Sequence, residues 1–137
     1  DNTVTEGTDD FIMYCFSNVE GYQKIGSYVG DGDGGDGRFV FTGFRPAFIL
    51  FKATDSAVTW NVFDNRRTSI NGFTSGTSGR LRLLPAQYNQ EISTNFLHIL
   101  SNGFMMRSSS SAVNGLGTNY LYYAIADAQP FKFANAV

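Results

Sequence analysis

The stretch NFLHILSNGFMMR, residues Asn95–Arg107, carries the clearest structural signal in the chain. Short apolar runs flank Asn102-Gly103, as expected for two strands that meet at a tight turn. Asn-Gly tolerates the positive φ angles that a type I′ turn needs, and this turn matches the twist of paired antiparallel strands. The stretch therefore predicts a β-hairpin whose two-residue turn is Asn102-Gly103.

The rest of the chain repeats this pattern of short apolar runs, rich in aromatic and β-branched residues and cut off by Gly, Asn, Ser or Thr. Strands are expected at residues 11–16, 24–29, 38–42, 46–53, 58–63, 80–84, 93–100, 103–108 and 119–126. Short strands without helical crossovers imply an all-β fold, an antiparallel β-sandwich or jelly roll.

Three low-complexity pieces lie between these strands and are expected to be surface loops. They are Gly30–Gly37, Gly72–Gly79 and Ser108–Ser111. Residues 85–91 are predicted as either a loop or one to two turns of helix, which Pro85 would begin.

Length and charge exclude several classes of protein. The 137 residues suit one domain spanning the whole chain, 1–137, and the net charge of −2 has no basic concentration that favours nucleic acid. The longest apolar run, Pro46–Phe51, is too short to cross a bilayer.

Because the chain opens on Asp1 without a leader pattern, we expect a processed or excised part of a longer protein. Cys15, the only cysteine, lies in an apolar run and is expected to be buried and inert.

Four separated segments, in the same order, resemble a domain found in structural proteins of tailed-bacteriophage virions. They are VEGYQKIGSY (Val19–Tyr28), FVFTGFRPAFILFK (Phe39–Lys52), LSNGF (Leu100–Phe104) and PFKFANA (Pro130–Ala136). The resemblance implies a concanavalin-like double sheet and a place in the virion, on the tail or the capsid surface. It names no catalytic residue and no cofactor.

The acidic glycine loop Gly30–Gly37 suggests two interpretations. Its carboxylates Asp31, Asp33 and Asp36 are oxygen donors of the type that calcium prefers. However, the spacing does not fit an EF-hand, and the glycine-aspartate unit does not recur as a calcium β-roll requires. A solvated turn is the favoured interpretation, and a calcium site is the alternative.

Aromatic side chains suggest a contact with sugars, since their faces pack against the apolar side of a pyranose ring. Trp60, Tyr120 and Tyr122 are the candidates, with Asn61 beside Trp60. The alternating pattern around Trp60 equally suits a core or a subunit interface.

Catalytic chemistry finds little support in the sequence. The single histidine, His98, lies within a predicted strand, where a packed or structural role is expected rather than a catalytic base. A glycosidase needs two carboxylates that face one groove. The candidates are Glu20, Asp55, Asp64, Glu91 and Asp127, and strand-end acids such as these more often satisfy turn backbone.

The sequence is therefore interpreted as a phage virion structural module, of a tail fibre or related appendage, that acts in assembly and in contact with host-surface glycan. The alternatives are a capsid decoration protein, a tailspike-like polysaccharide depolymerase and a secreted lectin-like module. We expect no enzyme activity. Twenty Phe and Tyr residues against 22 charged ones favour a homo-oligomer, with a trimer as the first choice and other virion proteins as further partners.

Overall fold

A computed structural model describes residues 12–67, 80–85, 87–88 and 91–127. Within these ranges all regular structure is β-strand, so no helix there is long and apolar enough to cross a membrane. The strands are β1 (Gln23–Val29), β2 (Phe39–Phe41), β3 (Pro46–Ala53), β4 (Asn61–Asp64), β5 (Arg80–Leu83), β6 (Ile92–Thr94), β7 (Leu97–Leu100), β8 (Gly103–Met106) and β9 (Asn119–Ala126).

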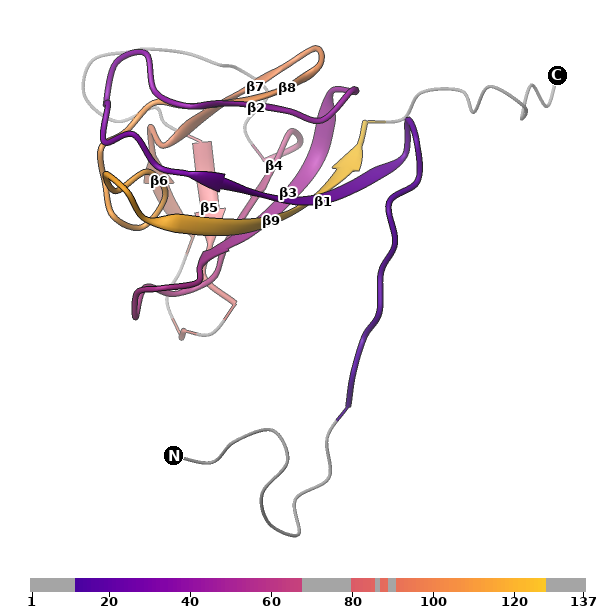
Figure 1. The fold of residues 1–137 in the computed structure, drawn as a ribbon, viewed down its shortest axis with the longest axis horizontal. Helices are drawn as coiled ribbons and strands as arrows, with labels where there is room; N and C mark the ends of the chain where they lie inside the picture. Colours follow the sequence, from indigo (N-terminus) through magenta and orange to yellow (C-terminus); the bar gives the residue numbers. More distant parts are fainter. Residues whose placement is uncertain (1–11, 68–79, 86, 89–90, 128–137) are drawn as a thin grey trace, which may run out of the picture.

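The strands form two antiparallel sheets. The larger sheet has the order β1-β9-β3-β4-β5-β6, and the smaller has the order β2-β8-β7. Figure 1 shows β2, β7 and β8 as a layer above β1, β9 and β3. The expected all-β antiparallel sandwich is confirmed.

Strand alternation builds the core between the two layers. On β9 every second side chain from Tyr120 to Ala124 is buried, and β3 does the same with its aromatic and aliphatic residues. The smaller sheet contributes the inward side chains of β7 and β8. The residues with no more than 2% of their surface exposed include Ile49, Phe51, Phe63, Leu97, Ile99, Phe104, Met106, Val113 and Tyr120.

The predicted hairpin exists, but its turn is one residue earlier than expected. Leu100 pairs with Gly103, so the turn residues are Ser101 and Asn102, and Gly103 begins β8. The prediction of a type I′ turn is wrong, because none of these three residues has a positive φ. Gly103 is instead a point of close approach, since a Cβ there would lie 2.1 Å from the carbonyl oxygen of Val40 on β2.

Two other expected strands differ in the structure. The segment 93–100 is divided, because β6 ends the larger sheet while β7 belongs to the smaller one, and the chain changes sheets at Asn95-Phe96. Residues 12–16 form no strand, and Cys15 is exposed rather than buried. The described residues of 85–91 contain no helix, and the expected loop at 72–79 lies outside the described residues.

Candidate functional site

The carboxylates of the acidic loop bind backbone amides of the loop itself and side chains beside it. Asp31 Oδ1 accepts hydrogen bonds from the Asp33 amide and from Asn114 Nδ2, at 3.1 and 2.7 Å. Asp33 Oδ1 accepts from the amides of Gly35 and Asp36, and the Asp36 carboxylate pairs with Arg107 at 3.0 Å. Among the described residues no three acidic, histidine or cysteine side chains gather as a metal site. The three carboxylates thus have partners that fit the turn interpretation.

The proposed sugar platform is corrected by burial. Tyr120 is fully buried and Tyr122 is only 3% exposed, so neither offers a ring face to a sugar. The Tyr120 hydroxyl donates to Ser111 O at 2.6 Å and accepts from the Gly115 amide at 2.9 Å. Asn61 is also fully buried and accepts a hydrogen bond from Arg82. Of the platform only Trp60, 38% exposed, remains at the surface.

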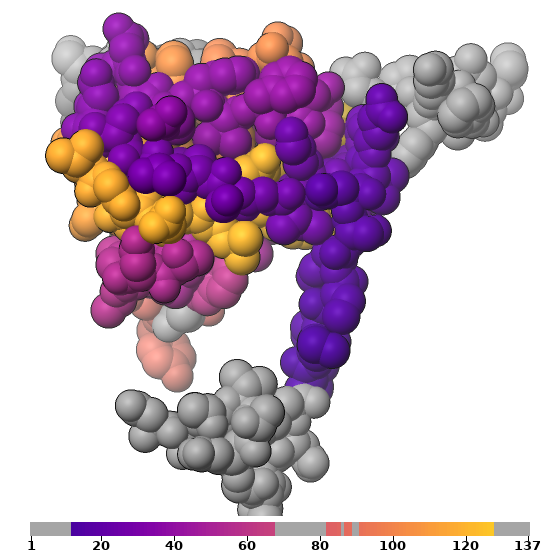
Figure 2. Space-filling model, in the orientation of Figure 1, coloured from indigo at the N-terminus to yellow at the C-terminus, as the bar shows by residue number. Residues whose placement is uncertain are grey.

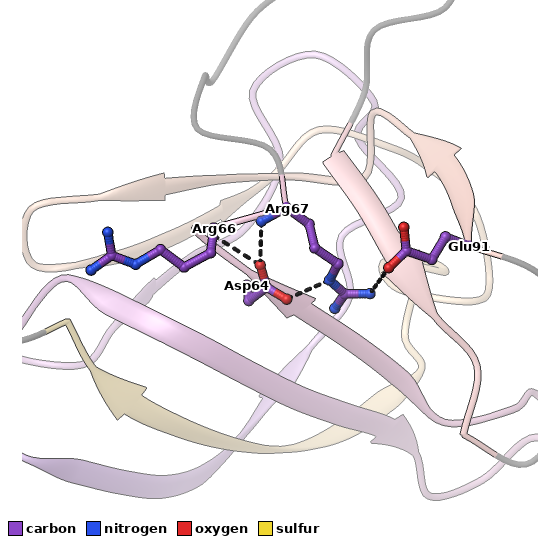
Figure 3. Close-up of polar contacts among 4 residues, drawn as sticks. All are labelled: Asp64, Arg66, Arg67 and Glu91. Carbon is purple, nitrogen blue, oxygen red and sulfur yellow. Dashed lines mark hydrogen bonds and ion pairs between the residues drawn. The ribbon is translucent and has the colours of Figure 1, made fainter.

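Two of the candidate carboxylates do meet, but across a guanidinium group. Figure 3 shows Arg67 between Asp64 and Glu91, with ion pairs to both. Asp64 Oδ1 also accepts the backbone amides of Arg66 and Arg67, at 2.9 and 2.8 Å. Partial burial acts to raise the Asp64 pKa, but these hydrogen bonds and the Arg67 charge outweigh it and lower the pKa. A glycosidase acid needs a raised pKa, so this cluster fits a structural anchor.

The remaining candidates are dispersed. Asp55 accepts two hydrogen bonds from Asn119, and Asp127 faces Arg45 and Arg66 at 4.0 and 3.6 Å. Glu20 is exposed in the turn before β1, and His98 is partly buried on β7, across from Met105.

A groove of about 540 Å³ opens between β1 and β2, the outermost strands of the two sheets on this side of the sandwich. Its lining is partly apolar and exposed: Val29, Phe39 and Phe41 are 45%, 42% and 56% exposed. The Tyr122 ring forms part of the lining next to Gly26, where a Cβ would lie within 3.0 Å of the phenol. Glycine at position 26 therefore leaves room for Tyr122.

Two cationic side chains form hydrogen bonds across this groove, from one rim to the other. Lys24 Nζ donates to the carbonyl oxygen of Phe41 at 2.9 Å and lies 5.2 Å from the centre of the Phe41 ring. Arg38 Nε donates to the carbonyl oxygen of Val29 at 3.1 Å. Within the described residues neither cation has a carboxylate within ion-pair distance. The groove is thus apolar in part and positively charged at its rims.

Residues 12–18, here called the arm, lead away from the sandwich before β1. Figures 1 and 2 show this segment in indigo, standing clear of the body. Its apolar side chains are exposed: Ile12 by 82%, Met13 by 83%, Tyr14 by 77% and Phe16 by 59%. Among the described residues, Phe16 is the one arm residue with a ring contact to the body, 4.9 Å between its centroid and that of Tyr123. Large apolar side chains at such exposure are typical of an interaction surface.

Local hydrogen bonds turn the arm away from its own sheet. Val19 and Gln23 exchange two backbone hydrogen bonds, which close a hairpin loop. The Ile25 amide, the next donor along the outer edge of β1, donates a hydrogen bond to Asn18 Oδ1 at 2.7 Å. Gln23 Nε2 donates a second side-chain hydrogen bond, to the carbonyl oxygen of Ser17. The pairing with β1 therefore ends at Val19, and residues 12–18 do not continue it as a strand along the β1 edge.

The sequence did not reveal the groove. Lys24 and Arg38 look like ordinary surface cations, and their acceptors are carbonyl groups on another strand that only the sheet arrangement brings near. The arm was visible as an apolar run, but its exposure was not.

Comparison with known proteins yields one result. A family profile described as "Domain of unknown function (DUF7483)" matches residues 1–130, and the chain belongs to this family. No curated protein and no solved structure matches the chain.

Proposed function

We propose that the chain is a structural module of a tailed-phage virion, in a tail fibre or related appendage, and that its work is assembly. The observation that carries this proposal is the arm, whose apolar side chains are exposed by 59 to 83%. Exposed apolar area of this kind costs solubility unless another protein surface covers it. The four sequence segments that resemble virion proteins supply the biological setting.

The module acts as a homo-oligomer, with three copies as the expected number. The loops that follow β1 and β8, Gly30–Gly37 and Ser108–Gly117, then remain free to contact other virion proteins or host-surface glycan. No catalysis belongs to this role. The hydrogen bonds and the ion pair that lower the pKa of Asp64 also make it unsuited to be the acid of a depolymerase.

Location in the particle tests the proposal. Antibodies raised against the purified domain are used for immunogold labelling of virions of the phage that encodes it, with an antibody to the major capsid protein as control. We expect gold at the tail. Label spread over the head would favour the capsid decoration alternative, and a chain missing from washed virions by mass spectrometry would refute a structural role.

A further inference from the structure

The arm and the groove are complementary surfaces within one chain. The arm offers apolar side chains at successive positions, Ile12 to Tyr14 and then Phe16, so an extended arm is apolar on both faces. The groove offers exposed Phe39 and Phe41 with cations at its rims. In sequence the arm follows directly on an acidic segment, which includes Glu6, Asp9 and Asp10. Charge and apolarity therefore match between the two.

The groove also has unused backbone groups. Ile25 directs its amide to the outer edge of β1, and Val29 directs its carbonyl there, so Ser27 presents its amide and carbonyl to the same edge. In the described residues no hydrogen bond occupies these Ser27 groups. An extended segment in the groove can pair with them, as peptides do that add to a sheet edge.

The arm of the same chain is badly placed for this position. Asn18 already occupies the Ile25 amide at the entrance to the β1 edge, and the chain leaves the sheet at that point. The arm of a second copy is not tethered at this point. It can reach the unoccupied Ser27 groups, while the Ile25 amide stays bound to Asn18.

We propose that the arm of one copy lies in the β1–β2 groove of a neighbouring copy. The aromatic side chains of the arm pack on Phe39 and Phe41, and the negative charge of the sequence before the arm favours a surface that carries Lys24 and Arg38. Such a head-to-tail contact joins different surfaces, so repetition closes a ring when the rotation allows, three copies in a trimer. This inference rests on the proposed assembly role and names its interface.

The native Cys15 gives a direct test, because it is the only cysteine and lies in the arm. Ser27→Cys places a thiol in the groove, and Ser56→Cys, in the exposed loop after β3, is the matched control. After mild oxidation, we expect Ser27→Cys to yield disulfide-linked multimers on a non-reducing gel. These should vanish in Cys15→Ser/Ser27→Cys, and Ser56→Cys should give far fewer.

Each other result overturns the inference. A monomer with an internal disulfide would place the arm in its own groove. Equal cross-linking by both cysteine variants would show contact without a defined interface. If the wild type is oligomeric by light scattering and Ser27→Cys does not cross-link, the groove assignment fails while the assembly role stands.

Charge reversal is a second test that does not depend on sulfur chemistry. Lys24→Glu/Arg38→Glu should weaken association about tenfold or more, since close charge pairs at interfaces are worth at least this much. Adding Asp9→Lys/Asp10→Lys should restore it, which a loss of folding alone would not allow. Should the reversal leave association unchanged but abolish binding to polygalacturonate, the groove holds an acidic glycan and the inference is wrong.

Discussion

At the scale of single residues, buried phenol groups tie the loop between β8 and β9 to the larger sheet. Burial raises the pKa of Tyr28 well above its ordinary value, so its hydroxyl remains protonated and donates to Val113 O at 2.7 Å. Tyr120 stacks on Tyr28, with ring centroids 4.9 Å apart, and ties the 111–115 turn to β9. These tyrosines act as core side chains with polar ends, which explains why they are not available to a sugar.

Tyr120→Phe should therefore destabilise the domain. The change leaves the Gly115 amide and the Ser111 carbonyl without their partner, and such a loss costs about 1–3 kcal/mol. Urea unfolding gives the free energy directly. Tyr123→Phe removes the hydrogen bond of a partly exposed tyrosine to Gln23; it is the control and should cost about 1 kcal/mol or less. Equal losses in the two variants would contradict the assigned role of Tyr120.

Asp64 predicts how stability depends on pH. Its pKa in the folded state lies below the ordinary value of 3.8, so its stabilisation is complete above that value and is lost as the pH falls through the folded pKa. Unfolding free energies at pH 7, 5 and 3 should fall mainly between the last two. Asp64→Asn should show a smaller fall. If the unfolding free energy of Asp64→Asn fell as much between pH 5 and pH 3 as that of the wild type, the anchoring role of the carboxylate would be refuted.

At the scale of elements, the sequence predicted the two longest strands well. The bounds of β3 and β9 agree with expectation, since each lies inside the larger sheet and buries every second side chain over most of its length. The hairpin at Asn102 shows the limit, because local turn preferences suggested positive φ at Gly103. The close approach of β2, the strand that pairs with β8, decides that position instead, and no local pattern reveals which distant strand pairs there.

Gly103→Ala tests this explanation. A methyl group would meet the Val40 carbonyl oxygen at 2.1 Å, so β2 and β8 must separate, at a cost of about 1–3 kcal/mol for overpacking. Gly21→Ala separates a steric clash from the cost of a positive φ angle. A Cβ at Gly21 would have no neighbour within 4 Å, whereas φ there is +73°, so this variant should cost about 1 kcal/mol through φ alone. Thermal unfolding measures both. An unchanged melting temperature for Gly103→Ala would rule out the close approach.

At the scale of the whole molecule, the functional surfaces come from what the fold leaves uncovered. Composition suggested more aromatic surface than one small sandwich hides, and the structure places much of it in the arm and along the β1–β2 groove. The sequence could not locate either surface. The path of the arm depends on side-chain hydrogen bonds of Asn18 and Gln23, and the groove depends on which strands end the two sheets.

The central claim, assembly through the arm, is tested most directly by light scattering on the purified chain at micromolar concentration. We predict a mass well above the 15.1 kDa of one chain, three times that value for a trimer. Ile12→Ser/Tyr14→Ser/Phe16→Ser should reduce it to one chain, whereas Leu116→Ser, at an equally exposed apolar side chain in a loop, should not. A wild-type monomer, or an arm variant that keeps the full mass, would contradict the claim.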